Sequence, residues 1–314
     1  MSDFLVEWCD GSTHVRAHTS GSTGCPKEIM LAKSDMRCSA VATNAFFGIG
    51  HGSVLATPLS ADYIAGKMMA VRAFLAGAEL LELPVSNEVR ISRTVDLLAV
   101  VPSQLPSLLN DPECAAKVRN LLIGGAAPSA EVCRRISEAG FNAFISYGMT
   151  ETCSHVALAR ASDPDRVFHA MPGISFSCDD RSCLVIEAPG YSFGTLTTND
   201  VVRLLDNTSF QWRGRADGVI NSGGLKFFPE ELEALYAPAL EGIEYFVTAV
   251  TDPKWGQAVC LIVEGCILGI EERIRKLGID RQRVPKRIIS VKALRRTANG
   301  KIDRSSKAIA EILS

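Results

Sequence analysis

The sequence predicts an α/β protein: a large N-terminal domain of helix-covered sheets with a β-rich subdomain, then a small C-terminal α+β domain. Two observations carry this prediction. Between about residues 53 and 146, short apolar runs alternate with glycine turns and with segments of helical spacing, which is typical of a sheet covered by helices. From about Ser182 the apolar runs follow one another closely and tight turns join them, and after Asp217 helical and strand patterns mix again.

The N-terminal elements follow from apolar spacing and from glycine and proline. Ser34–Phe47 carries apolar residues at helical spacing, with Ser34 as the expected N-cap. Leu97–Val101 is a continuous apolar run that suits a buried strand and stops at Pro102. We expect further strands and helices at these positions: strands at Ser53–Pro58, Glu79–Leu83, Leu121–Ile123 and Ala143–Ser146, and helices at Ala65–Leu75 and Ser129–Ala139.

The C-terminal half is assigned in the same way. The β-rich part has four expected strands, Leu184–Glu187, Gly194–Thr198, Val201–Leu205 and Phe210–Gly214. The unit after it has two expected helices, Phe228–Tyr236 and Ile270–Leu277, and three expected strands, Ile243–Val250, Ala258–Val263 and Ile288–Val291. Pro229 suits a first helical turn, where its missing N–H costs nothing. We place the boundary near Asp217, which divides the chain into residues 1–216 and 217–314.

Composition excludes several classes of protein. The chain has 314 residues, is 47% hydrophobic and 22% charged, and has a net charge of −2, so it can bury a large core and shows no basic stripe for nucleic acid. Its apolar runs are too short to span a bilayer, and residues 1–10 lack the pattern of a signal peptide. Ten cysteines without a C-x-x-C pair are typical of free thiols in a reducing compartment. We therefore expect a cytoplasmic protein without a nucleic-acid or membrane partner.

The stretch Thr19–Lys27 has the composition of a phosphate-binding loop. Small residues leave backbone N–H groups open to an anion, hydroxyl groups add donors, and the lysine supplies a cation. Its spacing differs from that of the Walker loop, in which Gly-Lys-Ser/Thr are adjacent, and a flexible Ser/Gly linker is the alternative. The candidate phosphate ligands are Thr19, Ser20, Gly21, Ser22, Thr23, Gly24 and Lys27.

The phosphate loop resembles that of the adenylate-forming enzymes, which include acyl-CoA synthetases, luciferases and peptide-synthetase adenylation domains. A second matching stretch, Ser146–Thr152, follows an apolar run and so lies where a strand ends and a ligand crevice opens. The resemblance implies that Tyr147 packs on adenine and is followed by Gly148. It also implies that Thr150 bonds the α-phosphate and that Glu151 helps to hold Mg²⁺. Aromatic faces stack on bases, and hard carboxylates suit hard cations.

Two further stretches match the family in its order along the chain. Asp200 follows Asn199, where relatives have glycine, and the resemblance implies that its carboxylate accepts bonds from the ribose hydroxyls. It also implies that Arg215 contacts ribose and phosphate, that Asp217 is the hinge, and that the glycine segment with Gly223 and Gly224 turns toward the active site for thioester formation. A surface ion pair is the alternative reading of Arg215 and Asp217.

The fourth match, Arg296–Arg304, resembles the C-terminal loop that presents the adenylation lysine. Lys301 is the expected bridge between the carboxylate substrate and the α-phosphate, where it stabilises charge moving toward pyrophosphate. Upstream, the small residues after a predicted strand would form a floor beside adenine and the acyl group. These are Gly124, Gly125 and Ala126.

The resemblance implies two half-reactions with ATP, Mg²⁺ and coenzyme A. A carboxylate attacks the α-phosphorus of ATP to give an acyl-adenylate and pyrophosphate, and a thiol then displaces AMP. Lys301 and the glycine segment belong to the small domain and cannot both face one site, so we expect this domain to rotate about Asp217 between the steps. The alternatives are a ligase for another aryl or acyl acid, an enzyme that loads a carrier protein, and a non-catalytic nucleotide-binding module.

The stretches Pro58–Met69 and Thr150–Ala157 most resemble the short o-succinylbenzoate–CoA ligases of menaquinone synthesis. That substrate keeps one free carboxylate, which a cation in the acyl pocket would pair with. Lys67 is the first candidate and Arg72 the second, and both are alternatively surface residues of their helix. His155 would line the acyl pocket or be held by local hydrogen bonds.

The first subdomain is expected to be truncated, because only residues 1–18 precede the phosphate loop, whereas most relatives have many more. Exposed sheet edges would then need a cover, for which a homodimer is one solution.

Overall fold

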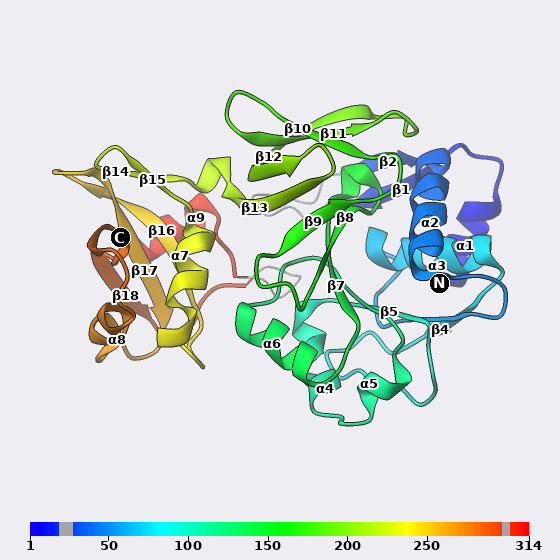
Figure 1. Cartoon of the computed structure of the whole chain (residues 1–314), viewed down its shortest axis with the longest axis horizontal. Helices are drawn as coiled ribbons and strands as arrows, with labels where there is room; N and C mark the ends of the chain where they lie inside the picture. The colour runs from blue at the N-terminus through cyan, green and yellow to red at the C-terminus, as the bar shows by residue number, and fades with distance from the viewer. Residues whose placement is uncertain (19–27, 297–301, 314) are drawn as a thin grey trace.

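The computed structural model describes residues 1–18, 28–296 and 302–313. Its strands form an eleven-stranded sheet, a separate five-stranded sheet and a two-stranded ribbon. Figure 1 shows β14–β18, with α7 and α8, grouped on one side of the molecule, apart from the eleven-stranded sheet and the first helices. The mixed α/β architecture with a large sheet and a smaller α+β part, predicted from the sequence, is confirmed.

One half of the large sheet is parallel and buried. Its strands are β3 (Val54–Thr57), β4 (Glu79–Glu82), β5 (Leu97–Val100), β6 (Leu121–Ile123) and β7 (Ala143–Gly148), in the spatial order β4-β3-β5-β6-β7. The four residues of β5 are all buried, as a continuous apolar run in a parallel sheet requires.

Three helices of this half lie where the sequence predicts them, within one residue at each end. They are α2 (Lys33–Phe47), α3 (Ile64–Ala76) and α6 (Ala130–Glu138). The structure adds two short helices that the sequence analysis did not predict, α4 (Leu105–Leu109) and α5 (Cys114–Lys117). Both α2 and α3 end at a glycine in the left-handed conformation, Gly48 and Gly77, because glycine adopts that conformation without a Cβ clash. The expected N-cap at Ser34 is wrong: α2 begins one residue earlier and its N-cap is Ala32.

The other half of the large sheet is antiparallel. It contains β8 (His155–Arg160), β9 (Val167–Ala170), β10 (Ser175–Cys178), β11 (Cys183–Ala188), β12 (Gly194–Asp206) and β13 (Ser209–Arg215). The β-rich part thus begins at His155, well before Ser182, and is continuous with the parallel half. The predicted break between Thr198 and Val201 is also wrong, because Asp200 lies inside one thirteen-residue strand that accommodates it with a bulge.

Three segments near the ends of the chain form elements that the sequence did not reveal. They are α1 (Ser2–Cys9), the ribbon of β1 (His14–His18) and β2 (Glu28–Ala32), and α9 (Ser306–Leu313). Helix α1 buries Phe4 and Trp8 in a cluster with Met68 and Val71 of α3. Each of these elements is too short for a strong periodic signal, so its position is decided by packing.

The C-terminal part has its own sheet and core. It contains β14 (Ile220–Ser222), β15 (Leu225–Phe227), α7 (Pro229–Tyr236), β16 (Tyr245–Asp252), β17 (Gly256–Glu264), α8 (Ile270–Lys276) and β18 (Arg287–Val291). Tyr236, Leu261 and Ile274 are fully buried in this core. The change from one sheet to the other occurs between Arg215 and Ile220, and the domain boundary at Asp217 stays a prediction. In the part of the chain that the structure describes, none of the helices combines the length and apolarity needed to cross a bilayer.

Candidate active site

Two of the predicted ligand segments meet where the parallel strands end. Gly124 follows β6, and its N–H donates to the carbonyl of Val100 at 2.9 Å. Ser146, near the end of β7, donates from Oγ to the carbonyl of Ile123 at 3.0 Å. A Cβ on Gly124 would lie 3.3 Å from Ser146 Oγ, so a small residue is needed for the two segments to approach this closely. The following residues, Gly125 and Ala126, are exposed.

Tyr147 and Asp200 are joined directly. The tyrosine hydroxyl donates to Oδ2 of Asp200 at 2.7 Å. The ring of Tyr147 is half-buried and packs edge-on against Phe168 and Phe210, with centroid distances of 5.8 and 5.1 Å. Burial, and next the negative charge of Asp200, raise the pKa of Tyr147, so its hydroxyl keeps its proton and acts as a donor. The stacking of Tyr147 on adenine stays a prediction.

Arg215 stands between Asp200 and Asp217. It lies opposite Asp200 across β12 and β13, while its guanidinium donates from Nε and Nη2 to the two oxygens of Asp217 at 3.0 and 2.8 Å. This bidentate pair raises the pKa of Arg215 and lowers that of Asp217. The predicted ribose ligand, phosphate ligand and hinge residue are therefore adjacent, and Arg215 is held by the hinge residue.

The side chain of Thr152 stabilises the backbone turn after Gly148. The backbone N–H of Met149 donates to Thr152 Oγ1 at 3.0 Å, and that hydroxyl lies 2.7 Å from the carbonyl oxygen of Ser154. A Cβ on Gly148 would lie 2.3 Å from that same carbonyl oxygen, so only glycine fits there. The turn is the short helix η2 (Thr150–Thr152).

Glu151 is exposed on this turn. Among the described residues, no three His, Cys, Asp or Glu side chains gather into a metal centre. Mg²⁺ is commonly held by one or two carboxylates and by substrate phosphates. A single exposed carboxylate beside the nucleotide segments fits that pattern.

Arg72 and His155, both predicted to line the acyl pocket, are brought together in the core of the large domain. Arg72 donates from Nη2 to Ser154 Oγ at 2.6 Å. The same hydroxyl lies 3.3 Å from Nδ1 of His155, whose Nε2 lies 3.2 Å from Oγ1 of Thr43. Arg72 and His155 are 2% and 6% exposed, so this chain of polar groups is shielded from water.

The charge of Arg72 has no counter-ion in the described part of the chain. Its contacts are Ser154 Oγ and the sulfur of Met69, and its Nε is buried without a hydrogen-bond partner. Burial lowers the pKa of Arg72 to about 10. Burial, and next the charge of Arg72, lower the pKa of His155 well below its usual value, so the imidazole is neutral.

Two buried polar atoms of α2 also lack partners, Ser39 Oγ and Asn44 Oδ1. The amide nitrogen of Asn44 does have a partner, because Nδ2 donates to the carbonyl of Arg72 at 2.9 Å. Sequence reasoning missed these α2 residues. The signal was present, since Ser39, Thr43 and Asn44 are polar at the spacing of one buried helix face.

Lys67 does not join this cluster. Its ammonium lies 3.3 Å from Oε2 of Glu7 and 4.7 Å from the ring centroid of Phe4, both on α1. Lys67 is buried, so it is not a surface residue, and its charge already faces a carboxylate of this chain. Of the two cations weighed for the acyl pocket, Arg72 is the one that lacks a counter-ion.

Gly223 and Gly224 form the two-residue turn between β14 and β15. Both have positive φ, 59° and 82°, as the tight turn of a hairpin requires. A Cβ on Gly223 would lie 2.5 Å from the ring of Trp255, whereas nothing lies within 4 Å of one on Gly224.

Two predicted segments lie outside the described residues. These are the phosphate loop, Thr19–Lys27, and Lys301 with the four residues before it. The residues that flank the phosphate loop, His18 and Glu28, are paired opposite each other in the β1–β2 ribbon.

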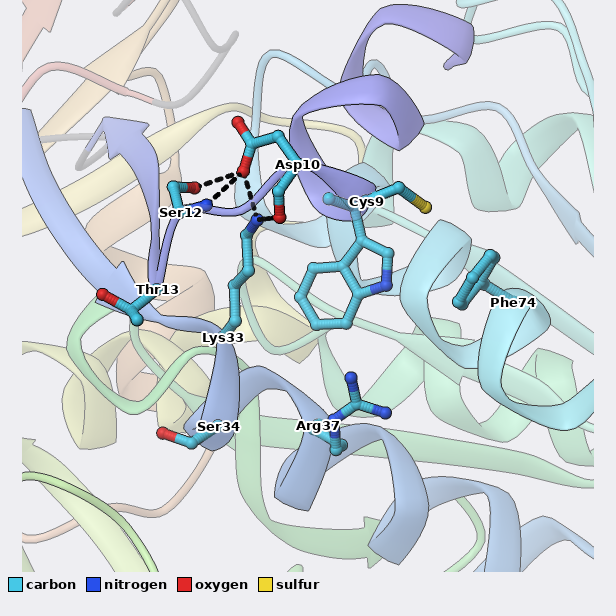
Figure 2. A pocket seen from close by; sticks show the side chains of 9 residues that line it. Cys9, Asp10, Ser12, Thr13, Lys33, Ser34, Arg37 and Phe74 are labelled. Atoms are coloured by element: carbon cyan, nitrogen blue, oxygen red, sulfur yellow. Dashed lines mark hydrogen bonds and ion pairs between the residues drawn. The ribbon is translucent and has the colours of Figure 1, made fainter.

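A surface hollow of about 640 Å³ lies beside α1, and none of the predicted site residues that the structure describes line it (Figure 2). Its lining includes Trp8, Lys33, Arg37 and Phe74. Lys33 donates from Nζ to Oδ1 of Asp10 at 2.7 Å (Figure 2). The described residues that line this hollow are not the predicted nucleotide ligands, and the described candidate site is the edge formed by β6, β7 and β12.

Comparison with known proteins adds independent support for the family. Residues 12–185 match the family described as AMP-binding enzyme. A probable 2-succinylbenzoate–CoA ligase from Mycobacterium tuberculosis is 28% identical over 331 positions, which cover 96% of this chain and 85% of that protein.

Solved structures agree with this result. One is the acyl-CoA synthetase (AMP-forming)/AMP-acid ligase II-like protein from Dyadobacter fermentans. It is 33% identical, with a TM-score of 0.64 and coverage of 99% of this chain and 93% of that one. The o-succinylbenzoate CoA synthetase from Bacillus subtilis, in complex with the acyl-adenylate intermediate, has a TM-score of 0.78 at 22% identity. That match covers 92% of this chain and 66% of the longer chain, and it shows the shared fold.

Proposed function

The chain belongs to the AMP-binding enzyme family, and we propose that it is an ATP-dependent acid–CoA ligase whose acid is o-succinylbenzoate. The family match covers residues 12–185. The observation that supports this choice of acid is the buried guanidinium of Arg72, which faces no carboxylate of the described chain. An acid that keeps a second carboxylate after activation would supply the missing charge.

In the first half-reaction, the acid's carboxylate oxygen attacks the α-phosphorus of ATP, and the bond from that phosphorus to the pyrophosphate oxygen breaks. The chain would act mainly by positioning the reactants and offsetting phosphate charge. Asp200 would hold the ribose hydroxyls, with Tyr147 fixing the orientation of its carboxylate. Thr150 would bond the α-phosphate. Lys27 would hold the departing pyrophosphate, and Lys301 would stabilise the charge that develops in the transition state.

Glu151 would be the protein ligand of Mg²⁺, which offsets phosphate charge when bound. Its exposure leaves the carboxylate free to meet a metal carried in by the nucleotide.

Arg72 would bind the free succinyl carboxylate of the acid. A buried cation gains most from a counter-ion when water is excluded. His155, neutral at physiological pH, would hold Ser154 and leave the only positive charge of this cluster on Arg72. Lys67 is the weaker candidate, because Glu7 already balances it.

In the second half-reaction, the sulfur of coenzyme A attacks the acyl carbon and AMP leaves. Lys301 and the Gly223–Gly224 turn would take part in different steps, so the C-terminal domain would rotate about Asp217 between them. The rotation would have to break or carry along the Arg215–Asp217 pair.

Pyrophosphate release tests this proposal. The purified chain is given ATP and Mg²⁺ with a panel of acids: o-succinylbenzoate, its analogue without the succinyl carboxylate, benzoate and acetate. We expect release with o-succinylbenzoate, and AMP with a thioester only after coenzyme A is added. Preference for another acid contradicts the substrate assignment. Release without a thioester indicates a carrier-protein thiol instead, and no release with any acid indicates a nucleotide-binding module.

A further inference from the structure

An ion pair outside the candidate active site joins the N-terminal lobe, which precedes Asp217, to the C-terminal lobe, which follows it. Arg213, on β13 of the large sheet, donates from Nε to Oε1 of Glu231 at 2.6 Å and from Nη2 to Oε2 at 3.2 Å. Glu231 lies in the first turn of α7, in the C-terminal part. The pair therefore bridges elements on opposite sides of Asp217.

An apolar contact accompanies this pair. Phe228, which directly precedes α7, is buried against Cys183 of β11 and Val201 of β12. The guanidinium carbon of Arg213 lies 5.1 Å from the centroid of the Phe228 ring. A single arginine thus pairs with the carboxylate of Glu231 and covers the ring that fills the junction.

The backbones of the two lobes also approach closely at Gly214. A Cβ at this position would lie 2.6 Å from Oε2 of Glu230 and 3.1 Å from Cδ1 of Phe228. The absence of a side chain at Gly214 lets the start of α7 lie directly on β13.

These contacts lie on both sides of the predicted hinge. A rotation about Asp217 moves α7 relative to β13, so it has to separate Phe228 and Glu231 from Arg213. We propose that Arg213, Phe228 and Glu231 form a latch that holds the arrangement of lobes seen here and opens when the C-terminal lobe rotates. This inference rests on the lobe rotation in the proposed function. It adds the contact that sets the equilibrium between the latched and the rotated arrangements of the lobes.

The strength of the latch suits repeated opening. The side chains of Arg213 and Glu231 are 46% and 37% exposed, and exposed ion pairs contribute little because water and salt screen them. Removal of the pair should therefore change the ratio of latched to open molecules by about three- to tenfold, while the fold of each lobe is preserved.

The distance between the lobes tests the latch directly. Fluorescent labels are attached to unnatural amino acids at two exposed positions, Glu138 on α6 and Glu272 on α8, and energy transfer is recorded without substrates. Arg213→Ala and Glu231→Ala should each shift the distance distribution toward open molecules. The exchanged pair, Arg213→Glu with Glu231→Arg, should restore it. Single variants without a shift, or an exchanged pair as open as the single variants, would overturn the proposal.

Gly214→Ala is a second variant that leaves both charges intact. Its methyl group would push α7 away from β13, so it should open the latch as well. Gly173→Ala is the matched control, because Gly173 has a positive φ of 80°, as Gly214 has one of 150°, and nothing lies within 4 Å of a Cβ there. Equal distance distributions for the two alanine variants would contradict the latch.

The half-reactions separate this proposal from the proposed function. Latch variants should change the rate of adenylate formation relative to that of thioester formation by about three- to tenfold, because the two steps use different arrangements of the lobes. If the chain releases no pyrophosphate but the variants still shift the distances, the ligase proposal fails and the latch stands. If turnover is normal and the distances do not move, the latch fails and the ligase proposal stands.

Discussion

The hydroxyl of Tyr147 donates a hydrogen bond of 2.7 Å to Oδ2 of Asp200, across 53 positions of sequence. The bond joins the end of β7, in the parallel half of the large sheet, to β12 in the antiparallel half. Asp200 also has its own N–H bound by the hydroxyl of Thr198 at 3.0 Å. The carboxylate predicted to hold the ribose is thus oriented before any nucleotide arrives.

Tyr147→Phe removes that orienting donor. Since Asp200 is only 9% exposed, the loss of a partner should lower the free energy of unfolding by roughly 1–3 kcal/mol and raise the KM for ATP. Urea denaturation and pyrophosphate release measure the two effects. Tyr63→Phe is the control, because that ring is 46% exposed, and a similar loss in both variants would contradict the assigned role of the Tyr147 hydroxyl.

Arg72→Gln should impair the use of o-succinylbenzoate selectively. Removing one partner of a buried ion pair costs roughly 2–5 kcal/mol, so kcat/KM should fall by about 30-fold or more. The analogue without the succinyl carboxylate should be affected far less. The exposed Arg37 serves as the matched control in Arg37→Gln. An equal loss for both acids would show that Arg72 acts on folding or on a shared step.

His155 should make stability depend on pH. Folding lowers the pKa of His155. At any pH between this folded-state pKa and the ordinary pKa of about 6.5, the unfolded chain therefore binds more protons than the folded one. Stability conferred by the neutral imidazole is therefore present above about pH 6.5 and is lost as pH falls, by at most about 1.4 kcal/mol per pH unit.

Urea denaturation at pH 5 to 8 measures this dependence in the wild type and in His155→Gln. The difference between the two proteins should shrink as the pH falls. His169→Gln, at an exposed histidine, should leave the wild-type slope unchanged. A constant difference for His155→Gln would contradict the lowered pKa, because it would mean that folding leaves proton binding by the imidazole unchanged.

The glycine turn offers a test of local geometry. Gly223→Ala and Gly224→Ala both place a side chain at positive φ, but only the first meets another residue, the ring of Trp255. We expect Gly224→Ala to cost about 1 kcal/mol from backbone strain and Gly223→Ala to cost clearly more. Thermal unfolding measures both, and equal losses would show that Trp255 does not cover the turn.

Lys301→Ala should slow adenylate formation by roughly 100-fold or more, because it removes a charge that stabilises the transition state. Thioester formation from supplied acyl-adenylate should continue. Lys307→Ala, at an exposed residue of α9, is the control. Adenylate formation at the normal rate in Lys301→Ala would remove Lys301 from the mechanism.

Local sequence signals predicted the regular part of the fold well. The run Leu97–Val101 became β5, and the segment before Gly77 became α3. These local signals failed where contacts from other parts of the chain decide the structure of a segment. Asp200 suggests a turn between two strands, yet β12 continues through it because both neighbouring strands supply hydrogen bonds.

The same division holds for the site. The order and residue types of the motifs indicated the family and made Arg72, Tyr147, Asp200 and His155 candidate site residues. These properties are present in the chain before it folds. Whether a cation is balanced depends on which distant segment packs beside it. Sequence ranked Lys67 first, but α1 brings Glu7 to it, whereas the cluster around His155 leaves Arg72 without a counter-ion. Burial raises the free-energy cost of an unpaired charge, and burial exists only in the tertiary structure.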